Sequence, residues 1–135
     1  MRKELKLLCA SAGGLLLGTT IAQAHHAFAA EFDAARPVEL RGIVTRMEWI
    51  NPHSWITIDI TTDEGAVETW EIEAGAPNAM FRRGFTRDSL PVGTEVVVRG
   101  YQARDGSQRA NGRDVTLPDG ERLFLGSSRP GDAAD

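Results

Sequence analysis

The sequence has almost no cysteine and almost no lysine. Cys9 is the only cysteine, and Lys3 and Lys6 are the only lysines, so all three lie within the first 24 residues. The rest of the chain therefore has no disulfide, no cysteine nucleophile and no thiolate metal site. Its basic residues are all arginines, and the whole chain carries a formal net charge of -4. A chain of this charge lacks the broad basic face that nucleic-acid binding needs.

Sequence motifs of common catalytic sites are absent as well. The chain contains no G-x-S-x-G elbow, no P-loop, no dinucleotide fingerprint and no C-x-x-C pair. It has one apolar run, at its N-terminus, which excludes a protein with several membrane-spanning helices. We therefore expect a protein that binds something rather than an enzyme.

The single apolar run predicts a secretory signal peptide over residues 1–24. A basic start precedes the mostly apolar residues 7–21, and an A-x-A cleavage site ends at Ala24. We expect cleavage after Ala24 and a periplasmic or secreted protein that begins at His25 and does not span the membrane after processing. An uncleaved N-terminal anchor is the alternative.

Apolar and polar residues alternate with a period of two over most of the remaining chain, which predicts β-strands. A proline near its start and Gly84 as a stop predict one short helix between them. Three strands, a helix and further strands is the order of an OB-like Greek-key barrel, with an open sheet as the alternative. We expect an all-β domain with one short helix, a small barrel of five to six strands. The expected strands are 37–49, 55–60, 66–73, 95–101, 113–117 and 122–125, and the expected helix is 76–83.

The expected domain, residues 37–126, is flanked by two segments without a strand pattern. Residues 25–36 are predicted to form an N-terminal arm, and residues 127–135 a flexible tail of small and polar residues. Within the first strand the apolar face changes after Gly42, which predicts a β-bulge there and a bend that lets one strand serve both halves of the barrel.

Several stretches also resemble a family of small exported bacterial proteins of unknown function. The resemblance rests on HHAFAAEFD, WINPHSWI, GAPNAMFRRGF, GYQARDGS and VTLPDGERLFLG, and it extends over essentially the whole chain after residue 24. It implies an exported single β domain and no particular activity. Relatives often carry serine in the third position of the His-His-x-Phe start, where this chain has Ala27, so the resemblance implies no role for a hydroxyl there.

The histidines predict a metal site. A histidine at a new N-terminus offers its α-amine and its imidazole Nδ1 as a chelating pair, and a second imidazole completes a nitrogen set that suits Cu(II). This resembles the histidine brace of copper-dependent polysaccharide monooxygenases and of certain periplasmic copper carriers. The candidate ligands are His25 together with His53, or His26 in place of His53, and Glu31 or Asp33 is a candidate outer ligand or hydrogen-bond partner.

Other interpretations of the histidines remain open. Residues 25–26 suit a plain polar arm or a site for another metal, and His53 suits a turn that caps backbone groups. Cleavage after Ala22 would instead place a histidine third, which is also a Cu(II) or Ni(II) motif. A copper-dependent oxidase is a further alternative.

Tryptophans around the same turn predict a second kind of site. Trp49, Asn51 and Trp55 flank the turn and could form a ligand rim for an envelope protein or a glycan. Packing in the core or at the barrel rim is the alternative for the tryptophans. The carboxylates of the third strand, Glu68, Glu71 and Glu73, form no obvious acid–base pair and are expected to be solvated.

Overall fold

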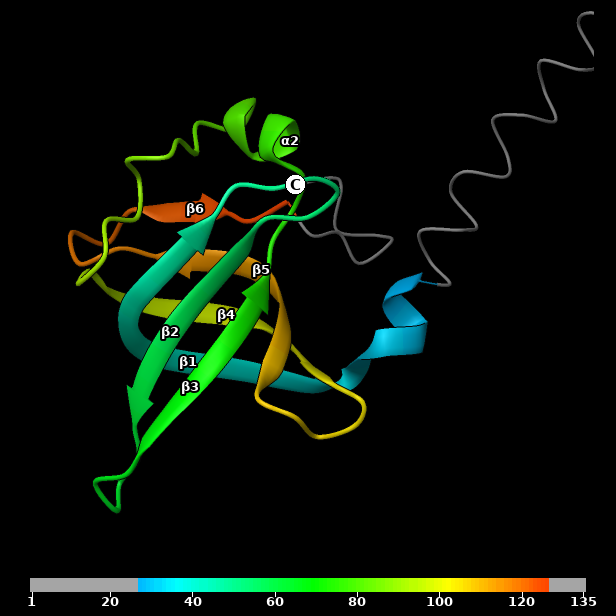
Figure 1. Ribbon diagram of the computed structural model, residues 1–135, viewed down its shortest axis with the longest axis vertical. Helices are drawn as coiled ribbons and strands as arrows, with labels where there is room; N and C mark the ends of the chain where they lie inside the picture. Colours follow the sequence, from blue (N-terminus) through cyan, green and yellow to red (C-terminus); the bar gives the residue numbers. More distant parts are fainter. Residues whose placement is uncertain (1–26, 127–135) are drawn as a thin grey trace, which may run out of the picture.

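The computed structural model describes residues 27–126, so the predicted signal peptide, His25, His26 and the predicted tail 127–135 lie outside the described residues. Residues 27–31 form a short helical turn, drawn in blue in Figure 1. The remaining elements are β1 (Phe32–Glu48), β2 (Trp55–Thr61), β3 (Val67–Glu73), α2 (Pro77–Phe81), β4 (Glu95–Ala103), β5 (Arg109–Thr116) and β6 (Arg122–Phe124).

The six strands form one sheet that closes on itself. Their order is β3-β2-β1-β4-β5-β6, and β3 also pairs with β5. Every neighbouring pair is antiparallel except β3 and β5, which run parallel. This parallel pairing, which we call the closing seam, joins Ile72 to Ala110 and Glu73 to Asn111. The ring confirms the predicted all-β OB-like barrel.

Strand β1 is long and bent, as Figure 1 shows, and pairs with β4 along one part and with β2 along the next. The bulge lies between Val44 and Arg46, where the pairing with β2 skips a residue, and not at Gly42 as the pattern predicts. Gly42 is required for another reason, because a Cβ there would lie 2.6 Å from the backbone oxygen of Asp59. The apolar side of β1 consequently runs on to Val44, which is buried, while Ile43 is exposed.

The barrel interior is filled by aliphatic side chains from all six strands and by residues that follow β3. Burial of such side chains is the main stabilising contribution to the fold. Helix α2 lies at the same end of the barrel as the β1–β2 loop (Figure 1) and inserts Met80 into the core. Fully buried members of the core are Val44, Ile56, Ile58, Ile72, Ala74, Met80, Phe85, Val98, Ala110, Val115 and Leu125.

Several element boundaries differ from the expected ones, most of them by one or two residues. Strand β1 begins at Phe32, within the predicted arm, and β5 begins at Arg109. Phe32 pairs with Ala103, but an irregularity before Pro37 interrupts the alternation that would mark a strand in the sequence. Helix α2 ends at Phe81, earlier than predicted. No helix among residues 27–126 is both long and apolar enough to cross a membrane.

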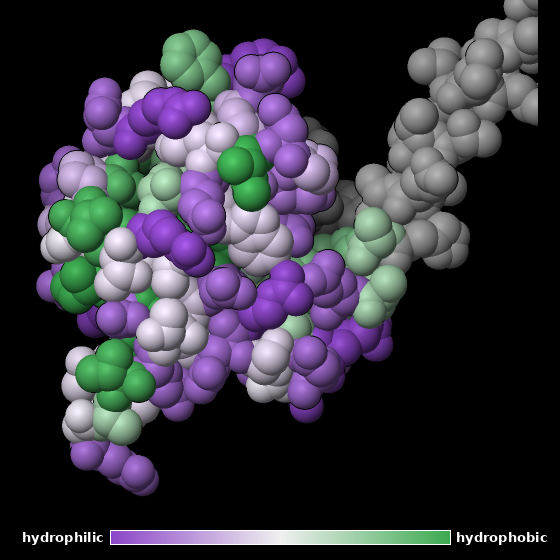
Figure 2. All heavy atoms as spheres, viewed as in Figure 1, coloured by the Kyte–Doolittle hydropathy of each residue, from purple (hydrophilic) through white to green (hydrophobic). Residues whose placement is uncertain are grey.

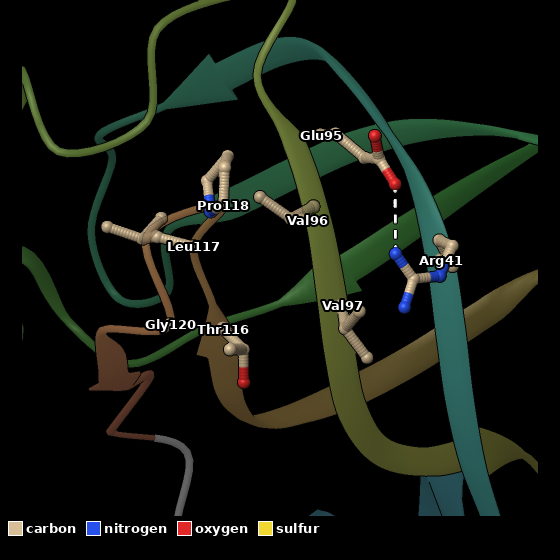
Figure 3. A pocket seen from close by; sticks show the side chains of 8 residues that line it. All are labelled: Arg41, Glu95, Val96, Val97, Thr116, Leu117, Pro118 and Gly120. Carbon is tan, nitrogen blue, oxygen red and sulfur yellow. Dashed lines mark hydrogen bonds and ion pairs between the residues drawn. The ribbon is translucent and has the colours of Figure 1, made fainter.

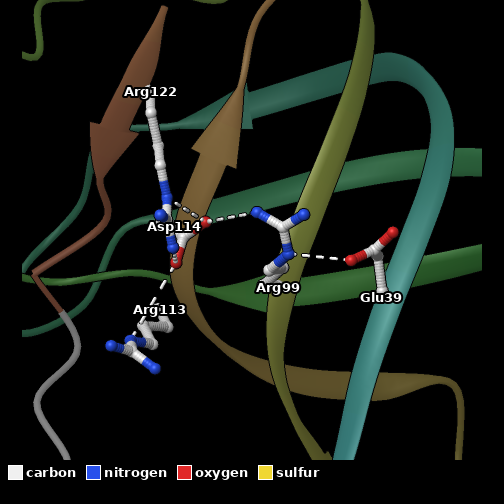
Figure 4. A network of polar contacts seen from close by, with 5 residues as sticks. All are labelled: Glu39, Arg99, Arg113, Asp114 and Arg122. Carbon is white, nitrogen blue, oxygen red and sulfur yellow. Dashed lines mark hydrogen bonds and ion pairs between the residues drawn. The ribbon is translucent and has the colours of Figure 1, made fainter.

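A polar network on the outside of the barrel links four strands (Figure 4). Its centre is Asp114, whose side chain is only 4% exposed and accepts two hydrogen bonds from Arg122, at 2.9 and 2.7 Å. Arg99 lies 3.8 Å from the same carboxylate and bonds Glu39 at 2.8 Å, and Arg113 lies 4.0 Å from Asp114. The network ties β6, β5, β4 and β1 together.

Candidate functional site

His53 lies in the loop between β1 and β2, at the edge of a cleft of about 420 Å³. Its side chain is 49% exposed. The loop contains a cis peptide bond between Asn51 and Pro52. Directly after His53, Ser54 donates its N–H to the oxygen of Gly75 and accepts a bond from the N–H of Ala74. These two backbone bonds hold the histidine beside the end of β3.

Glu73, the last residue of β3, lies next to His53 in the lining of the cleft. Its Oε1 lies 3.4 Å from Nδ1 of the histidine, and its side chain is only 11% exposed. Asn111 of β5 donates an Nδ2–H to the same oxygen at 3.3 Å. The expectation that Glu73 is solvated is therefore wrong, because the closing seam covers this end of β3.

Burial raises the pKa of the Glu73 carboxyl above its ordinary value of 4.5. The positive charge that His53 can carry acts in the opposite direction, and the carboxylate of Glu31 raises the pKa further. Asn111 and Arg109 lower it by smaller amounts. A buried carboxyl with a shifted pKa in a cleft is typical of a functional site.

The described part of the N-terminal arm packs against the barrel at this cleft. Phe28 contacts Tyr101 edge-on, with ring centroids 5.8 Å apart, and Glu31 forms an ion pair with Arg109 at 2.8 Å. The backbone N–H of Arg104 donates to the oxygen of Glu31 at 3.0 Å. Ala27, Phe28 and Glu31 line the same cleft as His53, Glu73 and Asn111. The chain thus reaches the cleft at the residue that directly follows His26.

The two candidate carboxylates of the arm differ in position. Glu31 lines the cleft, whereas Asp33 accepts a hydrogen bond from the N–H of Ala35 at 3.0 Å and is not part of the lining. Within residues 27–126, no three histidine, cysteine, aspartate or glutamate side chains converge on a metal position.

The tryptophans of the predicted ligand rim have different neighbours. Trp49 packs on the ring of Phe85 and lines a separate hollow of about 520 Å³ next to α2. Trp55 lies under the guanidinium of Arg109, 5.0 Å from its ring centroid. Asn51 is exposed and lines neither the cleft nor this hollow.

Trp70, the third tryptophan, is buried and donates its Nε1–H to Glu68 at 3.1 Å. Its position matches the core-packing alternative.

A further hollow, of about 350 Å³, lies between β4 and the β5–β6 turn (Figure 3). Its polar feature is the ion pair of Arg41 with Glu95 at 2.9 Å, and both side chains are mostly exposed. Leu117 and Pro118 form its apolar side. The space-filling view of the molecule shows a mainly hydrophilic face with separate apolar patches (Figure 2). The cleft at His53 is distinguished from these features by its buried carboxyl.

Sequence comparison gives one family match. The model of a family of unknown function, DUF6152, matches residues 14–112, which include the arm, His53, Glu73 and Asn111. No curated protein matches the chain. No solved structure matches it.

Proposed function

The chain belongs to the family of unknown function DUF6152, and we propose that it is an exported, non-enzymatic protein that binds Cu(II) for handling or delivery of the metal. The ligands are the α-amine and imidazole of His25 at the processed N-terminus together with the imidazole of His53. The observation that carries the proposal is the position of the arm, whose described residues 27–31 pack at the cleft where His53 lies.

Chain connectivity supports this ligand set. Consecutive Cα atoms are about 3.8 Å apart, so His25 lies within roughly 8 Å of the Cα of Ala27, which lines the cleft. A nitrogen-only set of this kind favours Cu(II) among the divalent first-row metals. His26 is the alternative second imidazole, but it would have to fold back over its own backbone to share a metal with His25.

The charges around the cleft also favour a cation. Glu31 and Glu73 both line it, and Arg109 forms an ion pair with Glu31. A metal-bound imidazole is neutral. His53 would then carry no positive charge to balance the carboxylate of Glu73, which lies 3.4 Å away. A bound cation would offset the cost of keeping that carboxylate ionised in a buried position.

Mass spectrometry and metal titration of the exported protein test the proposal. The intact mass defines the N-terminus, and Cu(II) titration of the same material measures affinity and stoichiometry. We expect a chain beginning at His25 that binds one equivalent of Cu(II). The affinity should fall below about pH 6, because the amine and the imidazoles must lose their protons to bind.

Variants separate this site from adventitious binding. His53→Ala and His25→Ala, with processing confirmed by mass, should each weaken the affinity, whereas Asn51→Ala in the same loop should leave it unchanged. A different N-terminus, or an affinity for Cu(II) in the millimolar range only, would overturn the proposal.

A second candidate function, glycan binding, is favoured by the hollow beside α2. Trp49, Asn78 and the 67%-exposed ring of Phe81 line it, which combines aromatic faces with an amide as sugar sites do. Phe81→Ala should then abolish retention on an envelope-glycan column while Cu(II) binding is retained. Equal retention of the wild-type protein and this variant would contradict it.

A further inference from the structure

The ionised form of Glu73 is energetically unfavourable at its position. Its side chain is buried at the closing seam, where ionisation of a carboxyl is unfavourable unless other groups compensate. Within the barrel, Asn111 contributes one neutral hydrogen bond of 3.3 Å, and Arg109 contributes a positive charge. The imidazole of His53 also lies within 3.4 Å of the carboxylate.

The contact between these two residues involves one particular nitrogen of the imidazole. Oε1 of Glu73 lies 3.4 Å from Nδ1 of His53. At this distance a carboxylate attracts an N–H group and repels a ring lone pair, so it favours the tautomer of a neutral imidazole that carries its proton on Nδ1. In that tautomer the lone pair on Nε2 is available to a metal ion.

We infer that Glu73, held by Asn111, is the positioning residue that fixes the orientation and tautomer of His53 and presents its Nε2 as the ligand. This inference rests on the proposed function and names the part of the site that the sequence does not reveal. Histidine ligands of metals commonly donate their second ring N–H to a carboxylate in this way, and loss of that partner typically lowers metal affinity by about 10- to 100-fold.

The arrangement gives the closing seam a role in the site. Glu73 and Asn111 are register partners of β3 and β5. Ser54, next to His53, is bonded to the two residues that follow Glu73. Backbone hydrogen bonds and the sheet therefore hold His53, Glu73 and Asn111 in place, which limits their relative movement.

The ¹⁵N chemical shifts of the His53 ring in the metal-free processed protein test the inference directly. In the neutral ring, the wild-type protein should show Nδ1 protonated and Nε2 unprotonated. Glu73→Leu should shift the population toward the Nε2–H tautomer that free histidine prefers in water. Glu73→Gln should preserve most of the wild-type state, because its amide oxygen still accepts a hydrogen bond.

Cu(II) affinities of the same proteins provide the second readout. Glu73→Leu should weaken binding about 10- to 100-fold and change the copper EPR spectrum, and Glu73→Gln should weaken it less. Glu64→Gln, in the β2–β3 turn at the opposite end of β2 (Figure 1), is the charge-matched control and should bind as the wild type does. If Glu73→Leu does not fold, the Gln variant and the wild-type tautomer still decide.

The outcomes separate the two proposals. An Nε2–H tautomer in the wild-type protein, or an Nδ1–H tautomer that survives in Glu73→Leu, would overturn the positioning role. Lower stability of the Leu variant with unchanged tautomer and unchanged EPR spectrum would make Glu73 a structural residue only. Absence of Cu(II) binding by the wild-type protein would overturn the proposed function, whereas a tautomer that depends on Glu73 would still support the positioning of His53.

Discussion

The guanidinium of Arg109 fastens the N-terminal arm to the barrel, with its Nη2 2.8 Å from Oε1 of Glu31. The same group lies 5.0 Å from the ring centroid of Trp55 and 3.9 Å from Glu71. One side chain of β5 thus connects the arm to β2 and β3 beside the cleft of His53. This connection adds to the contact of Phe28 with Tyr101 and to the backbone bond from Arg104 to Glu31, which also hold the arm at the cleft.

Arg109→Gln should weaken Cu(II) binding without removing a ligand, because the arm is then held less firmly at the cleft. A partly exposed ion pair contributes about 0.2–1 kcal/mol, which corresponds to a loss of at most about 5-fold in affinity. Isothermal titration calorimetry of the processed protein measures the effect. Arg104→Gln is the matched control, because the backbone N–H of Arg104, rather than its side chain, bonds Glu31. Equal affinities of the two variants would contradict the role of the Arg109 side chain.

Glu73→Gln should change how stability depends on pH. The pKa of Glu73 is raised by burial, so the folded protein holds this proton more tightly than the unfolded chain does. The contribution of Glu73 to the free energy of unfolding is therefore most favourable below pH 4.5 and declines as pH rises through the raised pKa. The Gln variant should gain stability relative to the wild type over that window.

Urea denaturation of the metal-free proteins between pH 4 and pH 7 is the measurement. Glu64→Gln serves again as the control, and the difference between it and the wild type should not increase across the same range. A Glu73→Gln variant that loses stability relative to the wild type as pH rises would show that the carboxylate is stabilising when ionised.

Asp114→Ala should destabilise the fold by about 1.5–3 kcal/mol, the usual contribution of hydrogen bonds to charged groups. The change removes both hydrogen bonds of Arg122 and leaves the guanidiniums around it without their shared carboxylate (Figure 4). Glu39→Ala, which removes an exposed partner of Arg99, should cost less than about 1 kcal/mol. Chemical denaturation compares the free energies of unfolding of the two variants. Equal losses would show that Asp114 contributes no more to stability than the exposed Glu39 does.

Gly100→Ala should destabilise the protein by about 1–3 kcal/mol or more, the cost of overpacking a filled space. A Cβ at this position would lie 2.1 Å from the backbone oxygen of Asn111, so β4 and β5 would have to separate. Val67→Ala, at an exposed strand position, should change stability by less than about 0.5 kcal/mol. Thermal and urea unfolding measure both, and a fully stable Gly100→Ala variant would mean that the two strands can move apart at little cost.

Most of the fold follows from local sequence pattern. Alternation over β2 and β3 predicts both strands nearly to the residue, and the order of strands and helix predicts the barrel. The bulge is displaced from Gly42 to the Val44–Arg46 step, because glycine marks a close approach of backbones as well as a bulge. Which of the two applies depends on the neighbouring strand, which the local pattern does not contain.

The site is predicted less completely than the fold. His53 and Glu31 are identified from the sequence because histidine and carboxylate suggest metal chemistry wherever they lie. Glu73 and Asn111 are missed, because their proximity depends on parallel pairing between β3 and β5, which are far apart in the sequence. The one available signal is weak: Glu73 ends a strand directly before the small residues Ala74 and Gly75, which allow another segment to approach closely.

The pairing of β3 with β5 also determines when His53 gains its carboxylate neighbour. Glu73 and Asn111 meet only after β3 has paired with β5, a contact between distant parts of the chain that forms late compared with a local hairpin. A nascent or partly folded chain would carry His25 and His53 but lack the acceptor that orients the second imidazole. Under the proposed function, completion of the barrel would therefore increase the affinity of the two histidines for Cu(II).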